Sequence, residues 1–332
     1  MKFGFIPTEG GSYYREFFEE VLLGESLGFD SVWLEEHHSV KNHYWPSPLI
    51  GLAGIATRTE RIMFGTDVLV LPFYHPVRMA EDAAMLAIMS QNRFILGAAI
   101  GYRPEEFALY QTPLEKRGAR FDEAVRLIQQ LWTEDKVQFN GKYYQLDGGK
   151  IEPRPASPPP LWLGGWGELS LKRAATLGDA WVPGPTAVLE KLLDAQKFYR
   201  ECLCAAGKDP ANTPTPLTRE VIIAETDEKA WEMAERHLLI NYRDEYGGGE
   251  WKHPLIGAED TARVDQIEAI SHDRFLVGSP ETVIRQLQKF KDTFGVDHLI
   301  CRLYFPGIPH EFIMNELKLL AGEVMPAFCT EK

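Results

Sequence analysis

The chain has 332 residues, 45% of them hydrophobic, so it is long enough to build a sizeable core in one large domain or two ordinary ones. Its 48 acidic residues outnumber its 35 basic residues, and the net charge of -13 argues against nucleic acid or an anionic membrane as a general partner. The apolar run at the N-terminus is too short for a signal peptide and no later run approaches a membrane span, so we expect a cytoplasmic protein.

The first half of the chain alternates short buried strands with amphipathic helices. The apolar periodicity predicts strands at 3–6, 31–34, 61–72 and 94–99, and helices at 14–27, 49–56, 77–90 and 117–132. A hairpin at about 137–146 then interrupts the repeat. Its Asn140-Gly141 pair is typical of a type I′ turn.

The second half resumes the alternation after a proline-rich connector. Strands are predicted at 161–163, 180–182, 217–224 and 297–303, and helices at 169–177, 188–206, 227–246, 280–294 and 310–326. Ser279 and Pro280 have the residue types of an N-cap and a first helical position. Residues 247–271, with three consecutive glycines and no clean periodicity, are interpreted as a lid-like insertion.

Eight strand-helix units indicate an α/β fold of the (β/α)₈ TIM-barrel type with insertions, because successive parallel strands need crossover helices. We therefore expect one barrel domain over residues 1–332, with its active site at the carboxyl ends of the strands.

Titratable side chains gather after the second predicted strand, in the run Glu35, Glu36, His37 and His38. Paired histidines beside carboxylates suit proton transfer near neutral pH, because the unperturbed pKa of imidazole lies there. The alternative is that one histidine is a packed loop residue and the other is solvated.

A glycine cluster, Gly164-Gly165-Trp166-Gly167, directly precedes a predicted helix after the fifth strand. Backbone N–H groups at such a helix start can hold a phosphate, although glycines also occur in ordinary tight turns. In barrels generally, the loops after strands seven and eight are the commoner phosphate site.

Taken together, several motifs resemble those of the bacterial luciferase-like flavin-dependent monooxygenases over nearly the whole chain. They are the opening Met-Lys-Phe-Gly, the segment from Gly28 to His38, Gly65-Thr-Asp-Val-Leu-Val-Leu-Pro with His75-Pro-Val-Arg, Met89-Ser-Gln-Asn-Arg-Phe, Val277-Gly-Ser-Pro-Glu and Val324-Met-Pro. The resemblance implies a barrel, usually a homodimer, that takes reduced FMN from a separate flavin reductase and uses O₂ to oxygenate a small organic substrate.

The resemblance also implies roles for individual residues. His37 matches the catalytic histidine, and a non-prolyl cis peptide beneath the flavin ring would fall at Asp67-Val68. The phosphate loop would fall on Gly165, Trp166 and Gly167, with Ser170 as a hydroxyl ligand and Tyr102 as a further cofactor contact. Ile100 departs from luciferase, which has a phosphate-binding arginine there, and Arg103 is a candidate substitute or a solvated loop charge.

Candidate substrate-binding residues are Glu36, His38, Tyr44 and Arg302. Arg302, near the end of the last strand, fits an anionic substrate group or a structural ion pair equally well.

Three other functions stay open. The first is an F420-dependent oxidoreductase on the same fold, which transfers hydride without oxygen. The second is a metal-dependent barrel hydrolase using His37 and His38, although the first strand lacks a His-x-His and the four cysteines form no C-x-x-C pair, so no metal is expected. The third is a non-catalytic flavin-binding relative.

Overall fold

The computed structural model describes residues 1–40, 44–242 and 270–328. The chain forms two compact units, which we call the terminal unit (Met1–Val32, Pro183–Phe198 and Pro214–Lys332) and the central unit (Trp33–Val182 and Tyr199–Thr213). Apart from its last two residues, the predicted lid at 247–271 lies outside the described residues.

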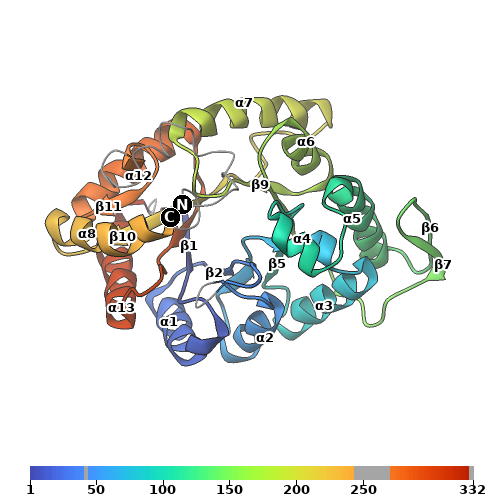
Figure 1. The fold of residues 1–332 in the computed structure, drawn as a ribbon, viewed down its shortest axis with the longest axis horizontal. Coiled ribbons are helices and arrows are strands. Elements are labelled where there is room, and N and C mark those ends of the chain that lie inside the picture. Colours follow the sequence, from blue (N-terminus) through green and yellow to red (C-terminus); the bar gives the residue numbers. More distant parts are fainter. Residues whose placement is uncertain (41–43, 243–269, 329–332) are drawn as a thin grey trace. The chain divides into compact units, whose positions relative to one another are not determined.

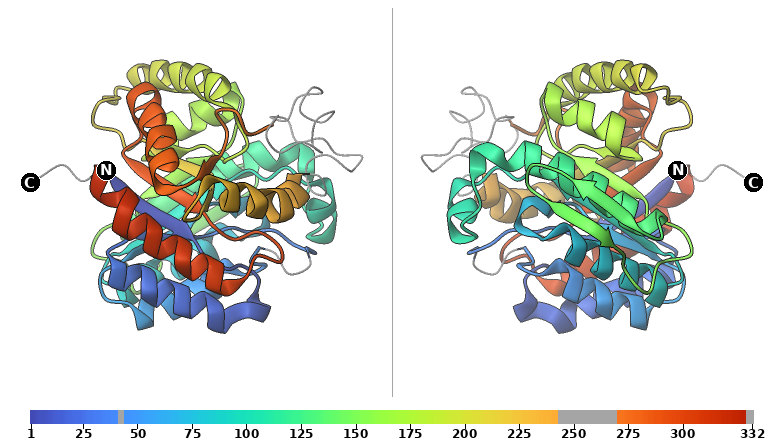
Figure 2. Two further views of the ribbon diagram at one scale, coloured as in Figure 1. Left: turned by 90° about the vertical axis from the view of Figure 1, so that its left-hand side faces the viewer. Right: turned by 90° about the vertical axis from the view of Figure 1, so that its right-hand side faces the viewer.

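The terminal unit contains parallel strands in the order β11-β10-β12-β1, with the first residues of β2 beside β1. Their helices include α1 and α13, which lie side by side (Figure 2). The strands are β1 (Lys2–Ile6), β2 (Ser31–Leu34), β10 (Pro216–Ile223), β11 (Leu276–Gly278) and β12 (His298–Arg302). The helices are α1 (Tyr14–Leu27), α8 (Asp227–Met233), α9 (Leu239–Asn241), α12 (Pro280–Phe294), α13 (His310–Leu319) and α14 (Met325–Phe328).

The central unit contains parallel strands in the order β3-β5-β8-β9, with β4 also paired to β5. Helices α2, α3, α5 and α6 follow one another along the outside of these strands (Figure 1). The strands are β3 (Met63–Thr66), β4 (Leu69–Val70), β5 (Phe94–Ala99), β8 (Leu161–Gly164) and β9 (Ala180–Val182). The helices are α2 (Pro48–Arg58), α3 (Pro76–Met89), α4 (Pro104–Leu109), α5 (Arg117–Thr133) and α6 (Glu168–Leu177); α7 (Leu189–Ala205) has residues in both units.

The predicted strand-helix alternation is confirmed along the described chain. The predicted helix at 14–27 and the strands at 31–34 and 94–99 have the observed bounds, and α1 ends where Gly28 takes a left-handed conformation with φ of 90°. Among the described residues, the strand β11 and the helix α4 were not predicted. Both are too short for a periodic pattern to reveal them.

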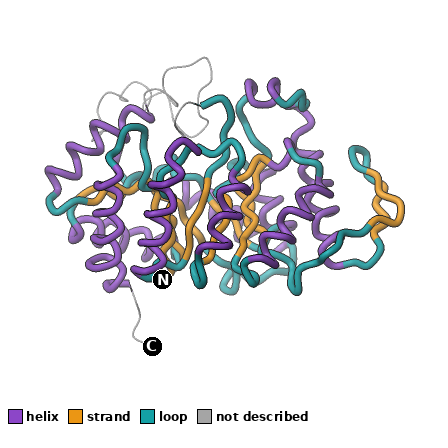
Figure 3. The backbone as a smooth tube through the Cα atoms, turned by 90° about the horizontal axis from the view of Figure 1, so that it is seen from below, coloured by secondary structure: helices purple, strands orange, loops and turns teal. Residues whose placement is uncertain are grey.

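The predicted type I′ turn at Asn140-Gly141 is wrong. Strands β6 (Val137–Asn140) and β7 (Gln145–Gly149) form the expected hairpin, which stands apart from the other strands of the central unit (Figure 3), but residues 141–144 connect them. Neither Asn140 nor Gly141 has a positive φ. The carboxylate of Glu123 on α5 accepts hydrogen bonds from the backbone N–H groups of Lys142, Tyr143 and Tyr144, so a contact with α5 decides the turn.

The strands of the central unit pack closely at two glycines, Gly65 on β3 and Gly97 on β5. The Trp33 and Trp162 rings stack with centroids 4.9 Å apart, and a Cβ on Gly65 would lie 2.6 Å from the Trp33 ring. A Cβ on Gly97 would lie 1.8 Å from the carbonyl oxygen of Thr66. These glycines therefore let the backbones approach closely where the strands lead into the loops.

Within the described residues, no helix combines the length and the apolar character needed to cross a membrane.

Candidate active site

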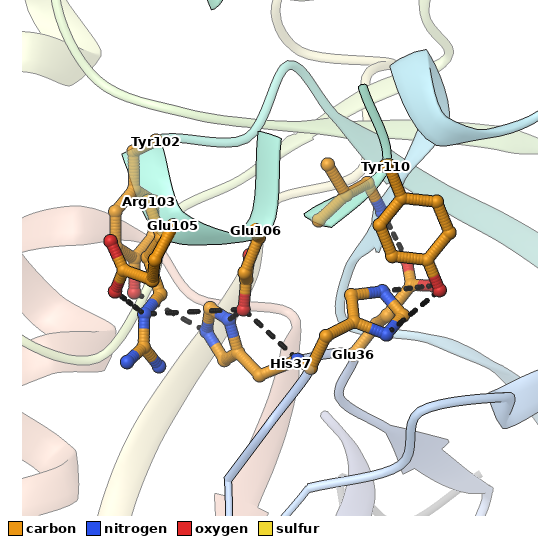
Figure 4. A network of polar contacts seen from close by, with 9 residues as sticks. Glu36, His37, Tyr102, Arg103, Glu105, Glu106 and Tyr110 are labelled. Carbon is orange, nitrogen blue, oxygen red and sulfur yellow. Dashed lines mark hydrogen bonds and ion pairs between the residues drawn. The ribbon is translucent and has the colours of Figure 1, made fainter. Parts of the chain in front are cut away.

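A buried glutamate, Glu106, holds the imidazole of His37. His37 and His38 follow β2 after Glu35 and Glu36, and Glu106 lies on the short helix α4 that follows β5. One carboxylate oxygen of Glu106 lies 2.7 Å from Nδ1 of His37 and accepts the backbone N–H of His38 at 3.0 Å (Figure 4). The Glu106 side chain is 1% exposed and that of His37 13%, so the pair is shielded from water but His37 retains an accessible edge.

The charge state of Glu106 sets the role of each nitrogen of His37. Burial raises the pKa of Glu106, but the hydrogen bond from His37 and the charge of that ring when protonated outweigh it, together with the hydrogen bond from the backbone of His38 and the charge of Arg103. The pKa of Glu106 is therefore below its usual value. An ionised carboxylate only accepts hydrogen bonds, so Nδ1 of His37 carries a hydrogen. In the neutral ring Nε2 is then the acceptor, and it lies 3.3 Å from the hydroxyl of Tyr102.

Two tyrosine rings surround His37. Tyr44 makes an edge contact with the imidazole at 4.5 Å between centroids, and Tyr102 makes another at 5.6 Å. Tyr44 is 3% exposed. Predicted site residues from two separate loops of the central unit are thus brought together around the imidazole of His37.

The second histidine has its own buried carboxylate. Nε2 of His38 lies 3.3 Å from Glu36, and the hydroxyl of Tyr110 lies 3.1 Å from Nδ1. Glu36 also accepts the backbone N–H of Val70 and the hydroxyl of Tyr74. Burial and the charge of Glu36 raise the pKa of Tyr74 far above its usual value, so its hydroxyl stays a donor.

Glu36 and His38 therefore bind protein groups and support the segment that contains β4. Their predicted contact with a substrate stays a prediction.

The Asp67-Val68 peptide bond is cis, as the resemblance implied. It joins β3 to β4 at the strand ends. A Cβ on Gly97 would lie 3.4 Å from the Val68 side chain, and one on Gly164 would lie 3.2 Å from it. Val68 thus packs over Gly97 of β5 and Gly164 of β8.

The glycine loop before α6 has the features of an anion cradle. Gly165 and Gly167 have φ angles of 123° and 83°, which side chains with a Cβ rarely adopt. No side chain caps the start of α6, and a Cβ on Gly167 would meet no atom within 4 Å. Ser170, 6% exposed, places its hydroxyl 3.1 Å from where a Cβ of Gly165 would lie. These residues fit a phosphate group held by backbone N–H groups and one hydroxyl.

The start of another helix, α12, is occupied by a carboxylate side chain. At the start of α12, Asp227 accepts the backbone N–H of Ser279 at 2.6 Å and the hydroxyl of Thr282 at 3.0 Å. These contacts lower the pKa of Asp227, and its negative charge would repel a phosphate. Ser279 is at the predicted N-cap position but makes no side-chain capping bond.

Arg302 lies in the terminal unit and is 1% exposed. Its guanidinium lies 3.6 Å from Glu220, which also accepts the hydroxyl of Tyr242 at 2.6 Å. The ion pair that was one interpretation of this arginine is therefore present. A contact with an anionic substrate stays a prediction.

Sequence reasoning missed Glu106, Tyr74 and Tyr110. A signal for Glu106 was present, since Pro104-Glu105-Glu106 after a strand end is a typical helix start. Nothing in the local pattern showed that this carboxylate would meet a histidine from β2. Among the described residues, no three His, Cys, Asp or Glu side chains are grouped as metal ligands would be.

The chain belongs to the luciferase-like monooxygenase family, whose family model matches residues 2–298. A solved monooxygenase, RslO1 from Streptomyces bottropensis, superposes with a TM-score of 0.85 at 25% identity, covering 99% of this chain and 100% of that one. The predicted luciferase-like TIM-barrel fold is thereby confirmed.

Two curated relatives differ in their cofactors. An F420-dependent glucose-6-phosphate dehydrogenase from Kineococcus radiotolerans is 37% identical over 296 residues, 86% of each chain. The oxygenase component of a flavin-dependent trigonelline monooxygenase from Acinetobacter baylyi is 25% identical over 333 residues, 96% of this chain and 91% of the relative. The chain is an oxidoreductase of a family whose members use a flavin or the deazaflavin F420.

Proposed function

We propose that the protein is an F420-dependent oxidoreductase that interconverts a hydroxyl and a carbonyl group in a small organic substrate. The observation that carries this proposal is the pairing of Nδ1 of His37 with the ionised Glu106, which directs Nε2 of the neutral ring toward the role of proton acceptor. Oxidation of an alcohol needs such a base, because the hydroxyl proton must leave as the carbon gives up its hydride. F420, when bound, would supply the acceptor for that hydride.

His37 takes the hydroxyl proton on Nε2, and the resulting imidazolium is stabilised by Glu106 through Nδ1. The hydroxyl of Tyr102, 3.3 Å from Nε2, is assigned the role of orienting the substrate oxygen. In the reverse direction His37 returns the proton to the carbonyl oxygen. The relative named as an F420-dependent glucose-6-phosphate dehydrogenase supports this assignment of cofactor and reaction.

The cofactor phosphate is assigned to the loop of Gly165, Trp166 and Gly167, with the Ser170 hydroxyl as a further donor. The uncapped start of α6 supports this assignment, because it offers N–H groups to an anion. The ring of the cofactor is assigned to the surface formed by Asp67 and Val68.

A second candidate is an FMN-dependent monooxygenase that takes reduced FMN from a separate reductase and uses O₂. The whole-chain likeness to the solved monooxygenase and to the trigonelline monooxygenase component favours it. The same loop would hold the FMN phosphate, and Tyr44 and Tyr102 would help to exclude water around His37. A homodimer and a cytoplasmic location, both expected from the sequence, remain proposals with either cofactor.

One experiment separates the two candidates. The purified protein is titrated with F420 and with FMN, and is then assayed without oxygen for F420 reduction by a panel of alcohols that includes glucose 6-phosphate. A parallel assay measures oxygen uptake with reduced FMN and aldehydes, ketones, sulfonates and aromatic compounds. Alcohol-dependent reduction of F420 is expected. Substrate-dependent oxygen uptake with FMN and no reduction of F420 would instead establish the monooxygenase.

A further inference from the structure

Trp181, on β9, contacts the glycine loop in two ways. Its indole Nε1 donates a hydrogen bond to the carbonyl oxygen of Gly165 at 2.9 Å. Its ring also meets the ring of Trp166 edge to face, with centroids 5.4 Å apart and planes at 87°. One buried side chain, 2% exposed, therefore holds both the backbone and a side chain of the loop.

The hydrogen bond fixes the orientation of one peptide group. Because C=O and N–H point in opposite directions across a trans peptide, a carbonyl of Gly165 directed at Trp181 turns the N–H of Trp166 away from it. Gly165, with φ of 123°, has the conformational freedom of glycine and would otherwise let this peptide rotate. Trp181 thus removes a rotation that would aim the N–H of Trp166 elsewhere.

The position of Trp181 is itself well determined. β9 pairs in parallel with β8, and Trp181 stands opposite Leu163, two residues before Gly165. On its other side the indole packs against the ring of Tyr199, with centroids 5.6 Å apart. The indole N–H is therefore held in place before any ligand binds, which lowers the entropic cost of ordering the loop.

We propose that Trp181 is a positioning residue for the cofactor phosphate, acting through the Gly165 carbonyl to present the loop N–H groups to the anion. This inference rests on the proposed role of the loop in cofactor binding. Trp181 does not touch the phosphate itself, so its effect is on the orientation of the donors.

The test is Trp181→Phe, which keeps an aromatic ring and removes the N–H donor. Affinities are measured for two ligand pairs, FMN with riboflavin and F420 with its phosphate-free deazaflavin. The matched control is Trp132→Phe, because Trp132 is also buried and donates from Nε1 to a backbone carbonyl, that of Ala80, at 3.0 Å. Trp181→Phe is expected to weaken the binding of the phosphate-bearing ligands about tenfold and that of the phosphate-free ligands less than twofold. Trp132→Phe should leave the ratio of the two dissociation constants unchanged in each ligand pair.

The outcomes separate this inference from the proposed function. If the unmodified protein binds each phosphate-free ligand as tightly as its phosphate-bearing partner, the loop is not a phosphate site, and the role of Trp181 fails together with the assignment of the cofactor phosphate to this loop. The proposed hydride transfer is then tested separately by F420 reduction. If the unmodified protein prefers the phosphate-bearing ligands and Trp181→Phe prefers them by the same factor, only the role of Trp181 is overturned.

A measurement on the unmodified protein covers the case in which Trp181→Phe does not fold. The indole N–H resonance of Trp181 is identified in tryptophan-labelled protein by its through-space contacts with Trp166 and Tyr199. Titration with inorganic phosphate is expected to shift this resonance and to leave that of Trp132 in place. A Trp181 signal that does not respond to phosphate would overturn the proposal.

Discussion

Replacing Glu106 with glutamine tests the base that the proposed reaction requires. The amide keeps the size of the side chain and an oxygen for the hydrogen on Nδ1 of His37, but it removes the negative charge 2.7 Å from that nitrogen. A net hydrogen bond to a charged group contributes roughly 1.5–3 kcal/mol, against about 0.5–1.5 kcal/mol for a neutral one. The charge therefore contributes on the order of 1–2 kcal/mol when His37 becomes an imidazolium.

If this energy is expressed in the transition state, kcat for alcohol oxidation falls roughly 5- to 30-fold in Glu106→Gln. Cofactor affinity should change little, because the phosphate loop lies on a different strand end. The assay is steady-state F420 reduction, with the cofactor Kd measured separately by titration.

The matched control is Glu105→Gln. Glu105 is the neighbouring residue on α4, but it is 56% exposed and pairs with Arg103 at 2.9 Å. Its substitution should leave kcat nearly unchanged, since exposed ion pairs contribute little. A Glu106→Gln enzyme with unchanged kcat, or equal losses in both variants, would refute the assignment of Glu106 as the partner of a catalytic base.

Three further predictions concern stability and the phosphate loop. Burial lowers the pKa of His298 from 6.5 to about 3, so between these values the unfolded chain binds more protons, and each unit of falling pH removes up to about 1.4 kcal/mol from the free energy of unfolding. Urea titrations at several pH values measure this slope, and His298→Gln should reduce it; an equal slope would show that other groups produce it. Gly97→Ala should destabilise the protein by about 1–3 kcal/mol or more in thermal unfolding, because the new Cβ would lie 1.8 Å from a backbone oxygen, and an unchanged melting temperature would contradict this packing. Gly165→Ala should weaken the binding of FMN more than that of riboflavin, because the new Cβ would lie 3.0 Å from Ser170. Equal losses of affinity for the two ligands would show that the phosphate does not bind at this loop.

Most strands and helices were predictable from the sequence because local signals agree with the fold. Apolar periodicity predicted α1, and the alternation of strands and helices predicted the parallel sheet. The turn at Asn140-Gly141 was mispredicted because a distant carboxylate, Glu123, binds its N–H groups. Local turn preference could not reveal that contact.

The site was only partly predictable for the same reason. His37 and the glycines of the phosphate loop stand out locally, as residue types that carry chemistry or unusual φ angles. Glu106 acts on His37, which lies 69 residues away in the chain, and Trp181 acts on Gly165, which lies 16 residues away. Their roles depend on which strands are neighbours, which a pattern within one segment does not contain.

The most direct test of the central claim is hydride transfer to F420 in the absence of oxygen. A panel of alcohols, each with deuterium on the carbinol carbon, is incubated with F420 and either the unmodified protein or His37→Ala. We expect deuterium to appear in the reduced deazaflavin with at least one alcohol, and the rate to fall on the order of a hundredfold or more in His37→Ala, because the variant lacks the base. Label transfer that proceeds equally fast without His37 would contradict the account, and so would its complete absence from a protein that couples reduced FMN and O₂ to substrate oxygenation.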